Sequence, residues 1–194
     1  ATGGRGTLAV TARVQGADVL LLFVESYGSV SWERPAFAEA LAPVRATLDE
    51  AIRASGRSVV STYLEPPTFG GESWLAHISL LSGTEVRDGA TNTRLMAQQR
   101  DTMVTAFARR GYRTVAVMPG IRGRWSEGAF YGFDEIFDAE KLAYRGPSFG
   151  WWDITDQFAL ARLDALELAA TDRKPVFAVF PTISTHTPFT PAPP

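Results

Sequence analysis

The chain lacks cysteine altogether, has only two histidines, and contains no long uninterrupted apolar run. The absence of cysteine excludes disulfides, thiolate catalysis and cysteine-based zinc sites. It leaves the compartment open, because periplasmic proteins can also lack cysteine. No run of eighteen apolar residues occurs, and no basic segment is followed by an apolar one. These 194 residues therefore contain no predicted membrane span and no predicted signal peptide.

An excess of charge of one sign is lacking as well. The 19 lysines and arginines nearly balance the 21 aspartates and glutamates, which leaves a formal net charge of -2. Nucleic-acid binding normally requires a concentrated basic surface, so we expect no nucleic-acid partner. The length of 194 residues and the 45% hydrophobic content are enough for one sizeable core. We therefore predict a single domain over residues 1–194.

Apolar patterning predicts strands that alternate with helices. Residues 19–24 form a continuous apolar run, which is typical of a strand buried on both faces of a parallel sheet. Further strands are predicted at residues 58–63, 114–118 and 175–180, and helices at 35–55, from Ser73 onward, at 93–110 and at 151–170. Residues 121–150 are rich in glycine, arginine and aromatic residues, which indicates a long irregular loop. This order predicts an α/β fold, a three-layer α/β/α sandwich with a mostly parallel central sheet.

Ser73 lies where a glycine turn meets an apolar helix. Backbone N–H groups at a helix start are unpaired and partly positive, so a phosphate or sulfate can be held there while the hydroxyl attacks it. The alternative is a plain helix cap, because serine is a preferred N-cap residue. The local sequence favours the cap. The neighbouring loops favour the nucleophile, because ligands gather beyond the carboxyl ends of the strands in an open α/β sheet.

Two further strand ends carry groups suited to phosphoryl chemistry. Glu25 directly follows the first predicted strand, where an isolated carboxylate is costly to bury. A metal ion would offset that cost, and the alternatives are a turn cap or an arginine pair. His186 follows the last predicted strand and could bind a phosphoryl oxygen, protonate a leaving alkoxide or ligate a metal. The alternative is an ordinary surface-loop histidine.

The remaining candidates are an aromatic wall, two cations and a second histidine. Trp125, with Arg122 and Arg124, offers an aromatic surface and cationic donors for an anionic head group. Solvated arginines and a loop-packing tryptophan are the alternative. His77 follows Ser73 by one helical turn and could act as its base. The apolar neighbours of His77 favour a buried structural histidine instead.

Taken together, these loops resemble the alkaline phosphatase and sulfatase superfamily, in particular its lipoteichoic acid synthase-like and phosphoglycerol transferase branch. The resemblance spans nearly the whole chain. It is carried by four segments in order: Val24-Glu25-Ser26-Tyr27-Gly28, Gly70-Gly71-Glu72-Ser73-Trp74, Arg124-Trp125-Ser126 with Tyr131-Gly132-Phe133-Asp134 and Phe137-Asp138, and residues 182–189 around His186.

The resemblance implies a role for each candidate residue. Ser73 would be the catalytic nucleophile and, with Glu25, would bind a divalent metal, zinc or manganese, with magnesium or calcium as alternatives. The substrate-binding residues would be His186, Trp125, Arg124 and Arg122.

The resemblance also implies a function in the envelope. We expect a membrane-anchored enzyme on the extracytoplasmic face of the bacterial cytoplasmic membrane, held by transmembrane helices outside this chain. It would transfer glycerol phosphate or phosphoethanolamine from a phospholipid to an envelope glycan or lipid. The alternatives are a hydrolase of the sulfatase or phosphodiesterase type, and a non-catalytic member that binds lipid head groups or a partner protein.

The sequence departs from that branch in several places. Ser73 replaces the usual threonine, a histidine expected near Pro119 is absent, and Trp125 is followed by Ser126-Glu127 instead of an asparagine and an arginine. Glu127 could therefore favour a cationic head group. No Asp-His dipeptide occurs, although the superfamily completes its metal site with one. We therefore expect a catalytic-domain fragment that lacks the later metal ligands and is itself inactive.

Overall fold

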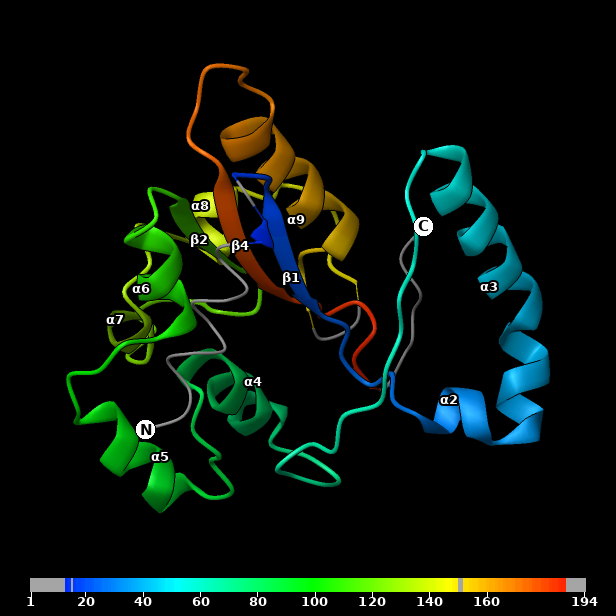
Figure 1. Cartoon of the computed structure of the whole chain (residues 1–194), viewed down its shortest axis with the longest axis horizontal. Helices are drawn as coiled ribbons and strands as arrows, with labels where there is room; N and C mark the ends of the chain where they lie inside the picture. The colour runs from blue at the N-terminus through cyan, green and yellow to red at the C-terminus, as the bar shows by residue number, and fades with distance from the viewer. Residues whose placement is uncertain (1–12, 15, 150–151, 188–194) are drawn as a thin grey trace. The chain divides into compact units, whose positions relative to one another are not determined.

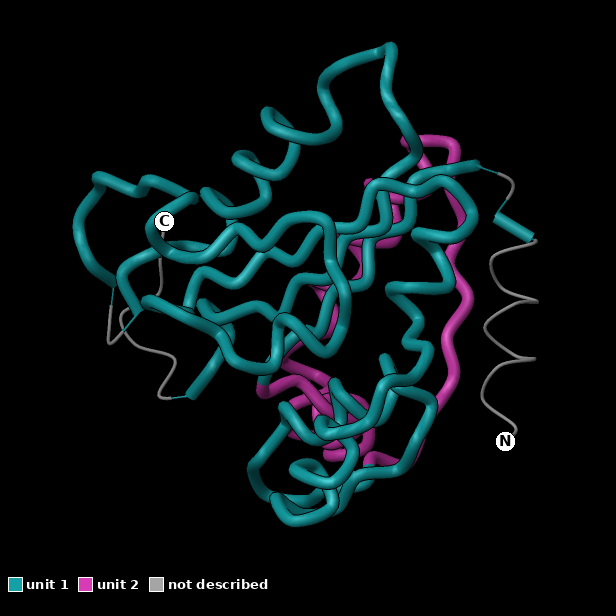
Figure 2. The backbone as a smooth tube through the Cα atoms, turned by 90° about the vertical axis from the view of Figure 1, so that its left-hand side faces the viewer, with its two compact units in different colours: residues 1–25, 67–194 teal, residues 26–66 magenta. Residues whose placement is uncertain are grey.

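A computed structural model describes residues 13–14, 16–149 and 152–187 (Figure 1). The described chain divides into two compact units (Figure 2). Unit 1 comprises the described residues up to Glu25 and those from Pro67 onward, and unit 2 comprises residues 26–66. The expectation of a single domain over residues 1–194 stays a prediction.

The described part of unit 1 is built on a four-stranded sheet whose strand pairs are all parallel. Its spatial order is β1-β4-β2-β3. The strands are β1 (Val19–Phe23), β2 (Arg113–Met118), β3 (Glu135–Asp138) and β4 (Val176–Pro181). The parallel pairing brings the carboxyl ends of the strands to one edge, where the sequence predicts the site.

Helices cover both faces of this sheet. They are α4 (Ser73–Ser82), α5 (Gly89–Met96), α6 (Met103–Ala108), α7 (Gly128–Tyr131), α8 (Ala139–Leu142) and α9 (Asp156–Leu163), and α9 continues into the π-helical η1 (Asp164–Leu168). Helices α4 and α6 pack on one face and α8 and α9 on the other (Figure 1). The predicted three-layer α/β/α arrangement with a parallel sheet is therefore confirmed.

Two apolar clusters hold the layers together. In the first, buried side chains of α4 and α6 contact β4, and the Phe107 ring stacks on Phe177 with centroids 4.1 Å apart. In the second, Ala159 and Leu163 of α9 pack against the opposite face, which includes Val115 of β2. Successive residues of β4 point to opposite faces, so this strand contributes to both clusters.

Unit 2 contains two helices, α2 (Val30–Glu33) and α3 (Pro35–Ala54). Helix α3 confirms the predicted helix over residues 35–55, and it begins with proline, whose fixed φ suits a first helical position. Within this unit, the Arg45 guanidinium lies 3.5 Å from the centre of the Trp32 ring.

Two predictions about the strands were wrong. Residues 58–63 form no strand, because no described strand pairs with this short segment. Val60, within it, is 97% exposed. Strand β1 is not buried on both faces: Leu20 and Leu22 are 43% and 39% exposed. They lie on the same face as Ala178 and Phe180, at the edge of the sheet, beyond the reach of the cluster formed with α9.

Other boundaries also differ from the predictions. The predicted loop over residues 121–150 contains α7, β3 and α8, and β3 was missed because only its two central residues are apolar. The predicted helix over 93–110 is two helices, α5 and α6, and Thr102 caps the second with its side chain. The predicted helix over 151–170 begins at Asp156; its expected first residue, 151, lies outside the described residues, as do residues 188 and 189 of the histidine segment.

Candidate active site

A strained turn delivers Ser73 to the start of α4. Gly70, Gly71 and Glu72 all have positive φ, at 77°, 151° and 53°. Glycine tolerates this region, but a left-handed glutamate is uncommon and typical of functional turns. Glu72 occupies the N-cap position, and the Ser73 hydroxyl donates a hydrogen bond to Glu25 Oε1 at 3.0 Å. The interpretation of Ser73 as a helix cap is therefore wrong, and its hydroxyl faces the end of β1.

The end of β1 is locked to the end of β4. The Glu25 N–H donates to Thr182 Oγ1 at 2.9 Å, and the Thr182 N–H donates to the carbonyl of Phe23 at 2.9 Å. Thr182 is buried. The backbone of Glu25 is therefore held in place, and its carboxylate is presented to Ser73 without an arginine partner or a turn-capping role among the described contacts.

His77 contacts the same carboxylate. Its Nε2 lies 3.1 Å from Glu25 Oε1, and its ring stacks on Phe23 with centroids 4.0 Å apart. The His77 side chain is 17% exposed and that of Glu25 is 13% exposed. His77 is largely buried, as expected, but the packing of α4 on β1 also turns its imidazole toward the carboxylate that Ser73 contacts. Its role stays a prediction.

Opposing effects set the charge of Glu25. Burial by itself raises the pKa of the Glu25 carboxyl. The hydrogen bond and charge of His77, the hydrogen bond from Ser73 and the charge of His186 outweigh burial, so the net pKa lies below the usual value. Glu25 is therefore ionised at neutral pH, as a metal ligand or proton acceptor must be.

The segment that carries His186 is clamped by Asp156. The Asp156 carboxylate accepts hydrogen bonds from the backbone N–H groups of Ile183 and Ser184, at 2.8 and 2.9 Å. The Ser184 hydroxyl in turn accepts from the Asp156 N–H at 2.9 Å. His186 Nδ1 donates to the Thr187 carbonyl at 2.7 Å. This clamp holds the histidine segment at the end of β4, close enough for the charge of His186 to lower the pKa of Glu25.

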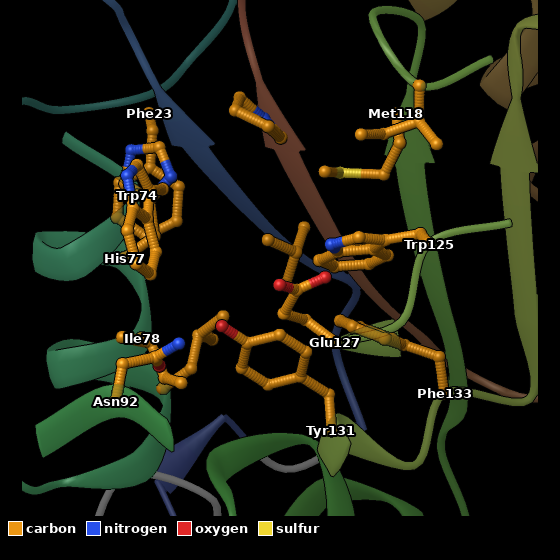
Figure 3. A pocket seen from close by; sticks show the side chains of 14 residues that line it. Phe23, Trp74, His77, Ile78, Asn92, Met118, Trp125, Glu127, Tyr131 and Phe133 are labelled. Atoms are coloured by element: carbon orange, nitrogen blue, oxygen red, sulfur yellow. The ribbon is translucent and has the colours of Figure 1, made fainter. Parts of the chain in front are cut away.

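A cavity of about 310 Å³ adjoins His77. Figure 3 shows Trp74 and His77 on one side, Trp125 and Phe133 on the other, and the Glu127 carboxylate between them. The lining residues are Phe23, Trp74, His77, Ile78, Leu81, Asn92, Met118, Ile121, Trp125, Glu127, Tyr131, Phe133, Val179 and Pro181. The volume is in the range of small-ligand pockets.

The predicted arginines do not join this cavity. Arg122 forms an ion pair with Asp153, and Arg124 is exposed. Neither lines the cavity. The structure thus brings Ser73 and Glu25 into contact and sets Trp125 in the cavity wall. The substrate-binding roles of Trp125, Arg122, Arg124 and His186 stay predictions.

The sulfatase family profile matches residues 76–194 of the chain. The chain belongs to the sulfatase family. This confirms the resemblance to the alkaline phosphatase and sulfatase superfamily.

Two solved structures share the fold of this sulfatase-family chain. The lipoteichoic acid synthase LtaP from Listeria monocytogenes superposes with a TM-score of 0.70 at 16% identity, over 90% of this chain and 42% of that one. A protein in the alkaline phosphatase superfamily from Vibrio parahaemolyticus gives 0.64 at 19% identity, over 89% and 41%. At these identities the likeness establishes the fold, and the chain spans less than half the length of either structure. No curated protein sequence matches.

Sulfatase-family members generally use divalent metals, so the donors in this chain matter. Glu25 offers a carboxylate, Ser73 a hydroxyl and His77 an imidazole. The hydroxyl and the imidazole both contact Oε1 of the Glu25 carboxylate. Oxygen and imidazole nitrogen donors suit zinc and manganese. Within the described ranges, however, no cluster of three or more histidine, aspartate or glutamate side chains is placed to hold a metal ion. The residues thus fit part of a coordination shell.

Two residues near the candidate site were not among the predicted site residues. His77 was considered and set aside, although its spacing from Ser73 was a usable signal. Asp156 left a weaker signal, an acidic residue in the first turn of a helix, which is common for reasons of helix polarity alone.

No helix in the described part of the chain is long and apolar enough to span a membrane.

Proposed function

We propose that this protein is a metal-dependent phosphotransferase of the bacterial cell envelope. It transfers glycerol phosphate or phosphoethanolamine from a phospholipid through a covalent Ser73 intermediate. The observation that carries this proposal is the contact of the Ser73 hydroxyl with Glu25, and of Glu25 with His77, at the strand ends of a sulfatase-family fold.

In the first half-reaction, Ser73 Oγ attacks phosphorus and forms an ester bond. The bond from phosphorus to the diacylglycerol oxygen breaks, and that oxygen leaves with the electron pair. The Ser73 hydroxyl already donates to Glu25 Oε1, so the Glu25 carboxylate takes up its proton. His77 Nε2 lies 3.1 Å from the same oxygen and holds the carboxylate in place. His186 orients a phosphoryl oxygen or protonates the leaving alkoxide. In the second half-reaction, the acceptor hydroxyl attacks phosphorus and gives its proton to His186, the bond from phosphorus to Ser73 Oγ breaks, and Oγ regains the proton held by Glu25.

A divalent ion at Glu25 and Ser73 would lower the pKa of the hydroxyl and polarise the phosphoryl oxygen. The acceptor is an envelope glycan or lipid. The proposed location is the extracytoplasmic face of the cytoplasmic membrane, with the anchor outside this chain. Its support is the likeness in fold to LtaP, a lipoteichoic acid synthase.

The test is transfer activity of the intact protein with labelled phosphatidylglycerol and phosphatidylethanolamine. Ser73→Ala is expected to lower transfer by at least about a hundredfold, because it removes the nucleophile. The control is Ser58→Ala, since Ser58 is exposed and lies in unit 2. Mass spectrometry of the trapped wild type should show a phosphorylated head group on the Ser73 peptide. Transfer that persists in Ser73→Ala would refute the mechanism.

The second candidate is a hydrolase with water as the acceptor, because the matching family profile is that of sulfatases. The formylglycine-type sulfatase signature does not fit residues 73–77, which favours a phosphate substrate. Product analysis separates the two functions. A head-group phosphate released into water in the presence of acceptor indicates hydrolysis, and a modified acceptor indicates transfer.

A further inference from the structure

The cavity beside His77 has an unusual chemistry for a site that handles anionic substrates. No lysine or arginine is among its described lining residues. Its walls carry the rings of Trp74, Trp125, Tyr131 and Phe133, and the negative faces of such rings attract cations. A second phosphate would find only the His77 imidazole, which is already paired with Glu25, whereas a cation would find several aromatic rings.

Two polar groups in the cavity are hydrogen-bond acceptors. The carboxylate of Glu127 lies between the two aromatic walls (Figure 3). It is half-buried, and one of its oxygens accepts a hydrogen bond from Ser126 at 2.7 Å. Asn92 is 8% exposed, and its Oδ1 is buried without a hydrogen-bond partner in the described part of the protein. A ligand N–H donor would satisfy it.

Tyr131 adds an uncharged hydroxyl and a further aromatic ring to the cavity. Burial, and then the charge of Glu127, raises the pKa of the Tyr131 hydroxyl, which therefore stays protonated. Figure 3 shows this hydroxyl directed toward the side of the cavity where Asn92 lies. The ring of Tyr131 packs against Trp125 with centroids 5.5 Å apart, so the two form one continuous aromatic wall.

The cavity adjoins the proposed catalytic residues. His77 lines it and also contacts Glu25, and Trp74 follows Ser73 directly on α4. A phosphate ester at Ser73 would therefore have its head group next to the cavity. A glycerol head group would bring uncharged hydroxyls into an apolar, aromatic space with few partners, which is unfavourable.

We propose that this cavity binds the ammonium end of the substrate, so that the transferred group is a phosphate ester of an amino alcohol and Glu127 determines this specificity. The inference rests on the proposed function and deepens it. The ammonium group pairs with Glu127, stacks on the aromatic walls and donates to Asn92. Primary and quaternary ammonium groups share the charge pairing with Glu127 and the aromatic contacts, but only a primary ammonium has N–H groups to donate to Asn92 Oδ1. The experiment separates the two.

The experiment measures binding of phosphoethanolamine, phosphocholine and glycerol 3-phosphate to the intact protein supplied with Mn²⁺ or Zn²⁺. The readouts are calorimetry and the fluorescence of the cavity tryptophans. We expect both ammonium compounds to bind about tenfold more tightly than glycerol 3-phosphate, the size of one favourable cation–π or ion-pair contribution. Tighter binding of phosphocholine indicates that the aromatic walls dominate. Tighter binding of phosphoethanolamine indicates that hydrogen bonds to Glu127 and Asn92 dominate.

Glu127→Gln keeps the size of the side chain and removes its charge. It should abolish the preference for ammonium compounds and leave glycerol 3-phosphate binding unchanged. The matched control is Glu140→Gln, an exposed glutamate at which the same change should have no effect. The inference is overturned if glycerol 3-phosphate binds as tightly as the ammonium compounds, if none of the three binds, or if Glu127→Gln keeps the preference.

These outcomes are independent of the test of Ser73. If Ser73→Ala keeps transfer activity while the ammonium preference follows Glu127, the covalent mechanism fails and the specificity stands. If Ser73→Ala is inactive and glycerol 3-phosphate is preferred, the mechanism stands and the specificity fails.

Discussion

Replacing Asp156 with alanine should release the loop that carries His186. Both oxygens of the Asp156 carboxylate accept backbone hydrogen bonds from this loop, from Ile183 at 2.8 Å and from Ser184 at 2.9 Å. Ile183 is 9% exposed, so its N–H has little access to water once the carboxylate is gone. The substitution thus removes two hydrogen bonds and leaves the buried Ile183 N–H without a partner.

The magnitude follows from those two bonds. Each hydrogen bond to a charged acceptor contributes about 1.5–3 kcal/mol, so the pair contributes about 3–6 kcal/mol before other costs. Burial opposes this: it raises the pKa of Asp156, and the hydrogen bonds from Ile183 and Ser184 offset only part of that rise. The ionised carboxylate therefore carries a desolvation cost. We expect a net loss of about 2–3 kcal/mol in the free energy of unfolding.

The same effect sets the pH dependence. The folded state holds the Asp156 proton more tightly than the unfolded chain does, because the pKa of an aspartate in an unfolded chain is about 3.9 and that of Asp156 in the folded state is raised. The wild-type stability from this group is therefore fully present below that pH and declines as pH rises through the raised folded-state pKa. The difference in stability between wild type and Asp156→Ala should be largest in acid and should narrow toward neutral pH.

Urea unfolding followed by tryptophan fluorescence measures this difference at several pH values. The control is Asp172→Ala, because Asp172 is exposed and its replacement should change stability by less than about 0.5 kcal/mol. The clamp would be refuted if Asp156→Ala matched the control, or if its deficit grew as pH rose. Transfer activity should fall together with stability, since His186 loses its position.

Two further predictions concern unit 1. The hydrogen bonds from Arg173, with its charge, hold the pKa of Asp18 below its usual value against the opposing effect of burial, so wild type should be more stable than Asp18→Asn at neutral pH. That stability advantage should vanish as pH falls below about 4 and through the lowered pKa of Asp18. Urea unfolding at a series of pH values measures it. A wild-type advantage that grows in acid would contradict the prediction. In Gly128→Ala, the new Cβ would lie 2.6 Å from Ile136 Cδ1 and 3.0 Å from Trp125 Cε3. The displaced indole should change the tryptophan fluorescence, weaken head-group binding and lower stability by about 1–3 kcal/mol, and unchanged spectra would show that the cavity wall tolerates the methyl group.

The sequence was sufficient for the strands that carry long apolar runs. Residues 19–24, 114–118 and 175–180 correspond to β1, β2 and β4, because short apolar runs bounded by turn residues favour strands. Burial on both faces holds for β2 and β4 but not for the edge strand β1. Strand β3 has only Ile136 and Phe137 as apolar residues and was missed. The opposite error arose at residues 58–63, where the β-branched pattern is present and the partner strand is not.

The two central residues of the site were also predictable. Glu25 follows an apolar strand and Ser73 follows a glycine turn, and the strand-end rule brings both to one edge. Their hydrogen bond of 3.0 Å confirms that they meet there. Local sequence could not show that Arg122 pairs with Asp153, because the two residues lie on separate segments of the chain.

By itself, the sequence determined the layered α/β architecture and the pair Glu25 and Ser73, because both depend on short-range patterns of apolar residues and turns. The superfamily came from the resemblance of four short segments to known motifs. Only the tertiary structure decided that His77 joins the carboxylate and that Asp156 clamps the histidine segment. It also decided that Glu127 enters an aromatic cavity with no lysine or arginine among its described lining. These facts depend on how α4, α7 and α9 pack at the sheet edge, and the direction of a side chain across that packing is not encoded in its neighbours along the chain.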